Sequence, residues 1–187
     1  MQFEDAEIPG LKIVTPRKHG DARGFVSEVY KQSDWRAAGL DLDFVQDNHS
    51  FSAPRGTLRG LHFQIQPAGQ DKLIRVVRGS ILDVAVDIRR SSPTFGKHVA
   101  IELSAESWRQ LLVPIGFAHG FVTLEPDTEV LYKMTNFYSP THDRGLAWDD
   151  PALGIAWPIA LGNATLSAKD RTNPRLADLP DHFIYTG

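Results

Sequence analysis

Short apolar runs that alternate with polar residues are the feature of this sequence that most restricts its fold. In the segment SILDVAVDI, residues 80–88, Leu82 and Val84 point to one face of an extended chain, whereas Ile81 and Asp83 point to the other. This two-residue period is typical of a β-strand and not of a helix. The run KLIRVV comes just before, joined by the dipeptide RG, so residues 72–88 are predicted to form two strands around a tight connection.

Further runs of this kind recur along the chain, and helical signals are brief. Strand candidates occupy residues 98–104, 109–114, 119–125 and 129–138, and helical signals are confined to residues 33–39 and 167–170. Strands and helices do not alternate as they would in a parallel sheet. At 187 residues the chain is long enough to bury one core. We therefore predict one all-β domain spanning residues 1–187, with a few short peripheral helices.

Composition and charge narrow the classes of function. The formal net charge is −3 and the isoelectric point is near 6.1, which argues against a general nucleic-acid or membrane-surface binder. Without cysteine, the chain has no disulfides, thiolate nucleophiles or cysteine-ligated zinc. The first residues, MQFEDAEIPGLKIV, have no basic segment followed by an apolar stretch, and no run approaches spanning length. We expect a cytoplasmic protein.

Two segments combine strand-like residues with reactive side chains. The segment RGLHFQIQPAGQDKLIRVVRG sets His62 ten residues before Lys72, and VPIGFAHGF contains the pattern P-x-G-x-x-H, which ends at His119. A histidine in such a run can bind a metal, form a structural hydrogen bond in the core or transfer protons. These two segments alone leave the three alternatives open.

The spacing of these segments resembles the two motifs of the cupin double-stranded β-helix, a jelly-roll barrel. In metal-binding cupins the first motif supplies two His and a Glu, and the second supplies one more His. Here Gln64 stands at the second histidine position and Lys72 at the acidic one. A lysine ammonium has no lone pair for a metal and repels cations. We therefore expect a cupin-like barrel without a metal, in which an organic acid–base set takes the place of the metal site.

A closer resemblance, to the dTDP-4-dehydrorhamnose 3,5-epimerase family, extends from about Gly20 to Asp170. It rests on blocks in family order: FVQDNHS, TLRGLHFQ, DVAVDIRRSSPTFGKHVAIELSAES, VPIGFAHGF, LYKMTNFYSP, WDDPALGIAWP and LSAKD. It implies epimerisation at C3 and C5 of dTDP-4-dehydro-6-deoxy-D-glucose to dTDP-4-dehydro-L-rhamnose, in dTDP-L-rhamnose biosynthesis, with no cofactor. One departure from the family pattern is Asp71, where the family more usually has Gly. An acid at this position could perturb the neighbouring Lys72.

The resemblance also implies which residues perform the chemistry. The hydrogens on C3 and C5 lie alpha to the C4 ketone, so either can be removed to leave an enolate. Inversion then needs a base on one face, an acid on the other and a group that stabilises the oxyanion. By the resemblance, His62 is the base, Asp170 its paired carboxylate, Tyr132 the acid and Lys72 the group near O4.

Strand alternation raises a conflict next to the predicted base. Strict alternation would place Arg59 and His62 on opposite faces of their strand. If both are to reach one pocket, Gly60 must allow a bulge or a sharp twist.

The resemblance further implies a substrate-binding set and a homodimer. Arg59 resembles a diphosphate contact, since a guanidinium fork fits phosphate oxygens. Residues 20–30, GDARGFVSEVY, resemble a hairpin that reaches into the neighbouring subunit and covers a sheet edge. The expected substrate-binding residues are Arg23 at the diphosphate across the dimer, Phe25 and Glu28 near the thymine, Gln46, Asn48, Arg59, His119 at the sugar, Tyr138 beside the nucleotide, and Lys169.

Two other functions remain open from the sequence. One is a single-position epimerase, acting at C3 only or C5 only on a related nucleotide 4-ketosugar. The other is a non-catalytic cupin that binds a sugar, although a pure binder has no need of a matched base and acid. Each residue alone also has a structural explanation, because a single strand histidine is more often a hydrogen-bonded structural residue than a base.

Overall fold

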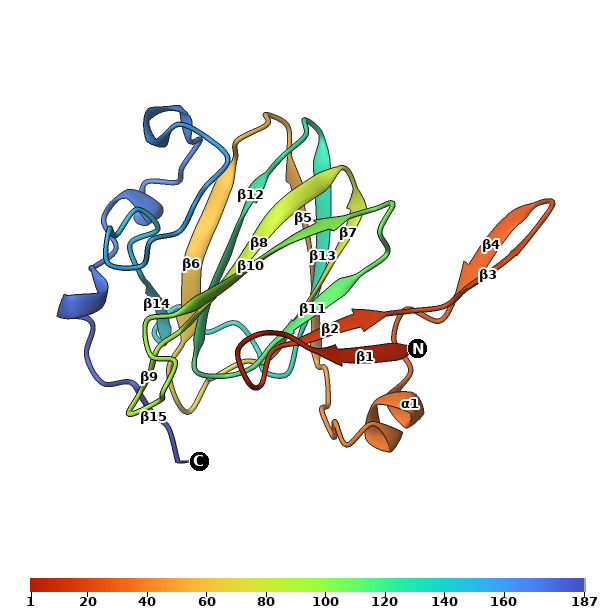
Figure 1. Ribbon diagram of the computed structural model, residues 1–187, viewed down its shortest axis with the longest axis horizontal. Coiled ribbons are helices and arrows are strands. Elements are labelled where there is room, and N and C mark those ends of the chain that lie inside the picture. Colours follow the sequence, from red (N-terminus) through yellow and green to blue (C-terminus); the bar gives the residue numbers. More distant parts are fainter. Residues whose placement is uncertain (187) are drawn as a thin grey trace.

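The protein, described by a computed structural model over residues 1–186, consists mainly of two antiparallel β-sheets that face each other (Figure 1). Across the six-stranded sheet the order is β1 (Gln2–Asp5), β2 (Lys12–Thr15), β11 (Gln110–Val113), β7 (Lys72–Arg78), β13 (Thr128–Met134) and β5 (Gln46–Ser52). Across the five-stranded sheet it is β10 (His98–Ser104), β8 (Ser80–Asp87), β12 (Phe117–Thr123), β6 (Leu58–Gln64) and β14 (Asp143–Gly145). The prediction of an all-β fold is confirmed.

The predicted strand segments all form strands, with differences at several of their ends. β12 begins at Phe117, earlier than predicted, and β13 ends at Met134, before the predicted end at residue 138. The connection between β7 and β8 is tight, as predicted, but the two strands belong to different sheets. The chain therefore crosses from one sheet to the other there, and does not form a hairpin.

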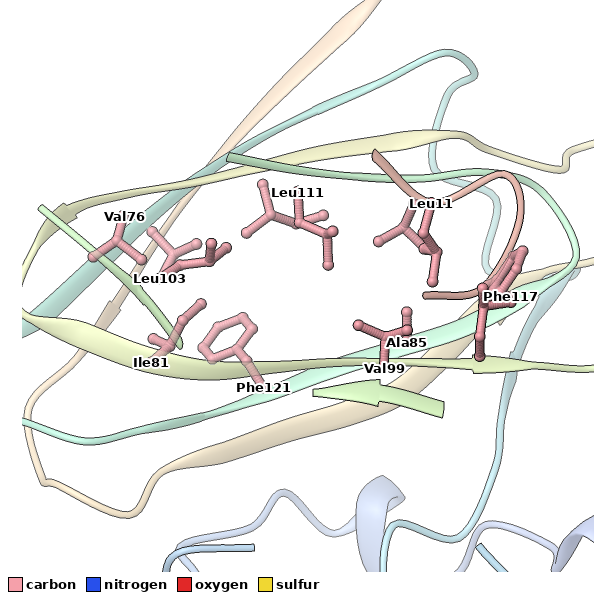
Figure 2. Packing of buried hydrophobic residues seen from close by; sticks show 13 residues of the cluster. Leu11, Val76, Ile81, Ala85, Val99, Leu103, Leu111, Phe117 and Phe121 are labelled. Carbon is pink, nitrogen blue, oxygen red and sulfur yellow. The ribbon is translucent and has the colours of Figure 1, made fainter. Parts of the chain in front are cut away.

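The space between the sheets is filled by apolar side chains from both of them (Figure 2). Ile81 and Ala85 of β8 enter this interior cluster, together with Val76 of β7 and Phe121 of β12. Val84 and Val86 point to the opposite face of β8, as the alternation predicts. β8 is thus buried on both faces, because a second apolar layer covers the outside of its sheet.

The outer faces of the sheets are covered by the ends of the chain. C-terminal residues, among them Leu153, Leu179 and Phe183, pack on the outside of the five-stranded sheet. Part of the six-stranded sheet is covered by a cluster around Trp35 of α1 (Gln32–Ala37), which lies where the sequence predicts a helix. The other short elements are β9 (Arg89–Arg90), η1 (Leu161–Asn163), η2 (Lys169–Arg171), η3 (Leu176–Asp178) and β15 (Phe183–Ile184).

One element lies largely outside this body and contacts it at Trp108. The hairpin of β3 (Lys18–Asp21) and β4 (Gly24–Ser27) projects away from both sheets (Figure 1). Its residues are almost all exposed, including Phe25 and Val26. In the described part of the chain, no helix has the length and apolar character needed to span a membrane.

Candidate active site

A cavity of about 250 Å³ is lined by residues from both sheets and from the C-terminal segment. All four predicted catalytic residues line it, together with Arg59 and His119 from the predicted substrate-binding set. The full lining is Ser50, Arg59, His62, Lys72, His119, Phe121, Tyr132, Ser167 and Asp170. Side chains that are far apart in the sequence are therefore brought together in one place.

A bulge in β6 allows Arg59 and His62 to share this cavity. His62 is paired with His119 of β12 and Arg59 with Phe121, so Gly60 and Leu61 lie opposite the single residue Gly120. The extra residue reverses the alternation, as was predicted at Gly60. The two backbones approach closely here, since a Cβ on Gly60 would lie 2.5 Å from the Gly120 Cα. Gly60 also has a φ of +140°, which disfavours any other residue.

His62 is held by a buried carboxylate on the short turn η2. Its Nε2 lies 2.5 Å from Oδ1 of Asp170, whose side chain is 3% exposed. Burial raises the pKa of Asp170, whereas the hydrogen bond with His62 and the charge of His62 lower it. The lowering effects together outweigh burial, so the pKa of Asp170 is below its usual value. The carboxylate is therefore ionised at neutral pH. Because Nε2 is occupied, Nδ1 is the ring nitrogen left for proton transfer.

Lys72 lies at the start of β7 beside the histidine. Its Nζ donates a hydrogen bond to the carbonyl oxygen of His62 at 3.4 Å. Burial lowers the pKa of Lys72 to about 8, although the charges of Asp143 and Asp83 act in the opposite direction. The ammonium is therefore present at neutral pH and is lost as the pH rises through about 8. It can stabilise a negative oxygen in the cavity.

Tyr132 reaches the cavity from the opposite sheet. It lies on β13 between Ile74 of β7 and Asn48 of β5, and its ring packs against the interior cluster. Val130 and Met134, which share its face, are buried, whereas Lys133 points outward to Asp47. The predicted alternation in this strand is thus confirmed. The phenol and the His62 imidazole come from facing walls of the fold.

His119 has a carboxylate partner that the sequence analysis did not identify. Its Nε2 lies 2.5 Å from Oδ1 of Asp83, a fully buried residue of β8. Alternation had already set Asp83 on one face with Ile81 and Ala85, which proves to be the interior face. A carboxylate in an apolar interior needs a partner, so this signal could have singled out Asp83, although it does not name His119 as that partner.

Four of the remaining predicted binding residues belong to one hydrogen-bond chain. The backbone N–H of Tyr138 donates to Gln46, which in turn donates to Asn48. The Tyr138 hydroxyl donates to Asp143 at 3.1 Å, and Lys169 forms an ion pair with the same carboxylate. Asp143 was also missed, because nothing in the sequence around it indicates this central place. This chain of hydrogen bonds connects the exposed Tyr138 to η2, the turn that contains Asp170.

The three predicted binding residues at the N-terminal hairpin do not line the cavity. Arg23 is paired with Asp21 and its side chain is 89% exposed. Phe25 packs edge-on against Trp108, and Glu28 is paired with Lys31. Within one chain, nothing directs these side chains to the cavity.

Gln64 and Asp71, where the sequence departs from the metal-cupin motif and from the family pattern, both form hydrogen bonds within the fold. Gln64, at the cupin metal-ligand position, is buried and bonded to Ala68, Phe137 and Ser139. Asp71 accepts hydrogen bonds from the Ile115 backbone N–H and the Thr135 hydroxyl, so its carboxylate is directed to these groups and not to Lys72. Within residues 1–186, no group of three or more His, Asp or Glu side chains is arranged to hold a metal ion.

Comparison with known proteins agrees with this geometry. The family model described as dTDP-4-dehydrorhamnose 3,5-epimerase matches residues 5–178. The dTDP-4-dehydrorhamnose 3,5-epimerase of Sinorhizobium fredii is 52% identical over 185 residues, which cover 99% of this chain and 94% of that protein. A crystal structure of dTDP-6-deoxy-D-glucose-3,5-epimerase from Legionella pneumophila, in complex with dTDP-4-keto-L-rhamnose, superposes with a TM-score of 0.94. Its sequence is 40% identical, with 100% of this chain and 99% of that chain covered.

A more distant structure differs in its described activity. The 3'-monoepimerase ChmJ from Streptomyces bikiniensis, in complex with dTDP-quinovose, is 36% identical, with a TM-score of 0.86 and coverage of 92% and 86% of the two chains. The family match over most of the chain, together with the relatives of high identity, decides the assignment. The chain belongs to the dTDP-4-dehydrorhamnose 3,5-epimerase family.

Proposed function

We propose that this protein inverts C3 and C5 of dTDP-4-dehydro-6-deoxy-D-glucose to give dTDP-4-dehydro-L-rhamnose, as a step of dTDP-L-rhamnose biosynthesis in the cytoplasm. The names of its relatives support the reaction, and the contents of the cavity supply the groups that it requires. The observation that supports the proposal most strongly is the placement of His62 and Tyr132 on facing sheets. A sugar ring between them would meet a base on one face and an acid on the other.

The proposed reaction begins at the imidazole. Nδ1 of His62 takes the proton from the carbon next to the C4 ketone, and the two electrons of that C–H bond move towards the carbonyl, leaving an enolate. The ionised Asp170 holds the ring through Nε2 and stabilises its cation. The Lys72 ammonium stabilises the enolate oxygen. No redox cofactor or metal takes part, so activity should survive extended chelation.

The second half of the reaction returns a proton from the other side. The Tyr132 hydroxyl donates its proton to the carbon on the face opposite His62, and the carbonyl is restored. The resulting phenolate regains a proton from solvent, and His62 loses its own. One such cycle at C3 and one at C5 give the proposed product.

Proton NMR of the product formed in deuterium oxide tests this proposal. Incubation with dTDP-4-dehydro-6-deoxy-D-glucose should give a product with the inverted configuration and solvent deuterium at both C3 and C5. Binding without exchange of any carbon-bound hydrogen would mean that the protein is a sugar-binding cupin and not an enzyme.

A second candidate is inversion at a single carbon of this or a related nucleotide 4-ketosugar. It is favoured by the similarity to a 3'-monoepimerase with the same overall fold. The same experiment separates the candidates, since label and inversion at C3 alone or C5 alone would establish the narrower activity.

We also propose that the active unit is a homodimer in which hairpins are exchanged. Support comes from the projection of β3 and β4 out of the body and from the exposure of Phe25 (52%) and Val26 (73%), which one chain leaves uncovered (Figure 1). Exchange would carry Arg23, Phe25 and Glu28 to the partner's cavity, where a diphosphate and a thymine could meet them. This accounts for their distance from the cavity of their own chain.

Mixed dimers of two variants, one with weakened substrate binding (Arg23→Ala) and one without the base (His62→Ala), test the exchange. If hairpins are exchanged, pairing an Arg23→Ala chain with a His62→Ala chain produces one site with both substitutions and one with neither. The mixture should therefore regain activity above that of either homodimer. Mixtures with no more activity than the two homodimers would show that each hairpin serves its own subunit.

A further inference from the structure

Asp83 is a carboxylate in a place where a carboxylate is costly. It lies on the inner face of β8, on the same side as Ile81 and Ala85 of the interior cluster, and its exposed fraction is 0%. An ionised group in such surroundings is destabilising unless specific partners offset the loss of water. Its presence therefore calls for an explanation in terms of what it contacts.

Within residues 1–186, only one of its two carboxylate oxygens has a hydrogen-bond partner. Oδ1 lies 2.5 Å from Nε2 of His119, which is a diagonal neighbour on the adjacent strand, because His119 pairs with Ala85 and Asp83 with Phe121. Oδ2 is buried and has no hydrogen-bond partner within residues 1–186. Since no other donor shares its charge, the field of the carboxylate acts on the cations nearby at the low dielectric of the interior.

A second buried carboxylate on the same strand shows that this arrangement is not general. Asp87 is also 0% exposed, but its two oxygens accept hydrogen bonds from Arg89, Ser92 and Thr94. It fixes the turn after β8 and does not line the cavity. Asp87 is fully satisfied as a structural residue, whereas Asp83 is not.

The group that Asp83 affects at a distance is Lys72. The charges of Asp83 and Asp143 raise the pKa of Lys72, whereas burial and the charge of Lys169 lower it. The ionisable groups around Lys72 in the cavity and its rim are Arg59 and His62 on β6, His119 on β12, Tyr132 on β13, Asp143 on β14, Asp83 on β8, and Lys169 and Asp170 on η2. Among the acids, Asp83 is the one placed inside the barrel wall, and Asp143 is already paired with Lys169.

We propose that Asp83 is a positioning residue for the reaction, which fixes the His119 ring by Nε2 and supplies the buried negative charge that balances the Lys72 ammonium. Because Nε2 is occupied, Nδ1 is the nitrogen of His119 left for the bound sugar. This inference rests on the proposed function, since it assigns Lys72 and His119 to the ketosugar. Asp83 itself does not touch the substrate.

The test compares Asp83→Asn with Asp87→Asn as a matched control. Both variants remove one buried carboxylate from the same face of β8 and both should lower the melting temperature. Asp83→Asn should lower kcat on the order of tenfold, as outer partners of reacting groups do, and should move the alkaline limb of the pH–rate profile to lower pH. The shift is expected because Lys72 loses a charge that keeps it protonated. Asp87→Asn should leave kcat and the alkaline limb unchanged below its melting temperature.

Direct titration of Lys72 keeps the test independent of turnover. In protein labelled with 15N-lysine, and assigned with a Lys72→Met variant, the wild-type Nζ should titrate near pH 8. It should titrate at lower pH in Asp83→Asn and unchanged in Asp87→Asn. If the wild type is active but Asp83→Asn leaves the Lys72 titration and the alkaline limb of the pH–rate profile unchanged, the inference about Asp83 is overturned and the proposed function stands. If the wild type inverts neither carbon, the proposed function is overturned, whatever the pH at which Lys72 titrates.

Discussion

The cavity contains two histidine–aspartate pairs that are alike in their atoms and different in their setting. His62 and His119 are cross-strand partners on β6 and β12, and each binds a carboxylate oxygen through Nε2 at 2.5 Å. Asp170 comes from the turn η2, outside the sheets, whereas Asp83 lies on the strand next to that of His119. The His62 side chain is 31% exposed, and that of His119 is 9% exposed.

This difference in setting indicates a difference in role. A base has to exchange its proton with solvent in every cycle, and the more open pair on a separate turn is suited to that. A ring fixed within the sheet, with a fully buried acid behind it, is suited to holding a substrate oxygen in place. Environment, and not the identity of the residues, assigns the roles of similar ionisable groups.

The largest loss is expected when the more open pair is broken. Asp170→Asn keeps the shape of the side chain but removes the charge that stabilises the His62 cation. Turnover should fall on the order of a hundredfold to ten-thousandfold, the range of a positioned base and its carboxylate. Steady-state kcat measured beside Asp83→Asn checks the contrast. A greater loss in Asp83→Asn than in Asp170→Asn would reverse the roles assigned to the two pairs.

Loss of the acid should affect one half of the reaction more than the other. Tyr132→Phe keeps the ring in the interior cluster and removes only the proton donor. His62 can still form the enolate, so deuterium should enter recovered substrate by return to the original face while inversion falls on the order of a hundredfold or more. NMR of substrate and product from one incubation measures both. Normal inversion in this variant would show that Tyr132 is only part of the cavity wall.

A smaller effect is expected at the close contact between β6 and β12 at Gly120, which holds the two histidine–aspartate pairs next to each other. A Cβ on Gly120 would lie 2.7 Å from the Arg59 carbonyl oxygen, so Gly120→Ala must push β6 and β12 apart. We expect a loss of about 1–3 kcal/mol in stability, a higher KM through Arg59 and a lower kcat through His62. Val122→Ala, which opens a cavity on the outer side of β12, is the control. It should lose comparable stability at unchanged kcat and KM, and equal kinetic effects in both variants would contradict the role of the contact.

The smallest effect is expected at Asp71, which belongs to neither pair. Asp71→Gly removes two hydrogen-bond acceptors and leaves the Ile115 N–H and the Thr135 O–H without an acceptor, at a cost of about 1–3 kcal/mol in the free energy of unfolding. The alkaline limb should stay near pH 8, because the charges that act on Lys72 are those of Asp143, Asp83 and Lys169. Chemical denaturation and a pH–rate profile check both points. Movement of the alkaline limb would show that Asp71 does act on its neighbour.

The strands were predictable because their pattern is local. The alternation in residues 80–88 places Ile81 and Asp83 on one face of β8, and the structure agrees. Which sheet each strand joins is not local, and this is why the connection between β7 and β8 could not be recognised as a crossing between sheets. The bulge at Gly60 was predictable only because two functional residues were required on one face.

The site was predictable as far as the family resemblance named its residues. His62, Lys72, Tyr132 and Asp170 were expected together, and they line one cavity. Asp83 and Asp143 were not identified, because their roles come from neighbours on other strands and on η2. The partner of a buried carboxylate is fixed by sheet register, which a single sequence does not specify.

The most direct test of the contrast between the pairs is solvent deuterium exchange into the ketosugar with His62→Asn and His119→Asn. Both substitutions keep a polar side chain of similar size, and exchange reports enolate formation separately from inversion. We predict that His62→Asn reduces exchange at C3 and C5 to the uncatalysed background. His119→Asn should exchange more slowly than wild type but clearly above that background. Exchange that persists in His62→Asn, or that disappears equally in both variants, would contradict the assignment of the base to His62.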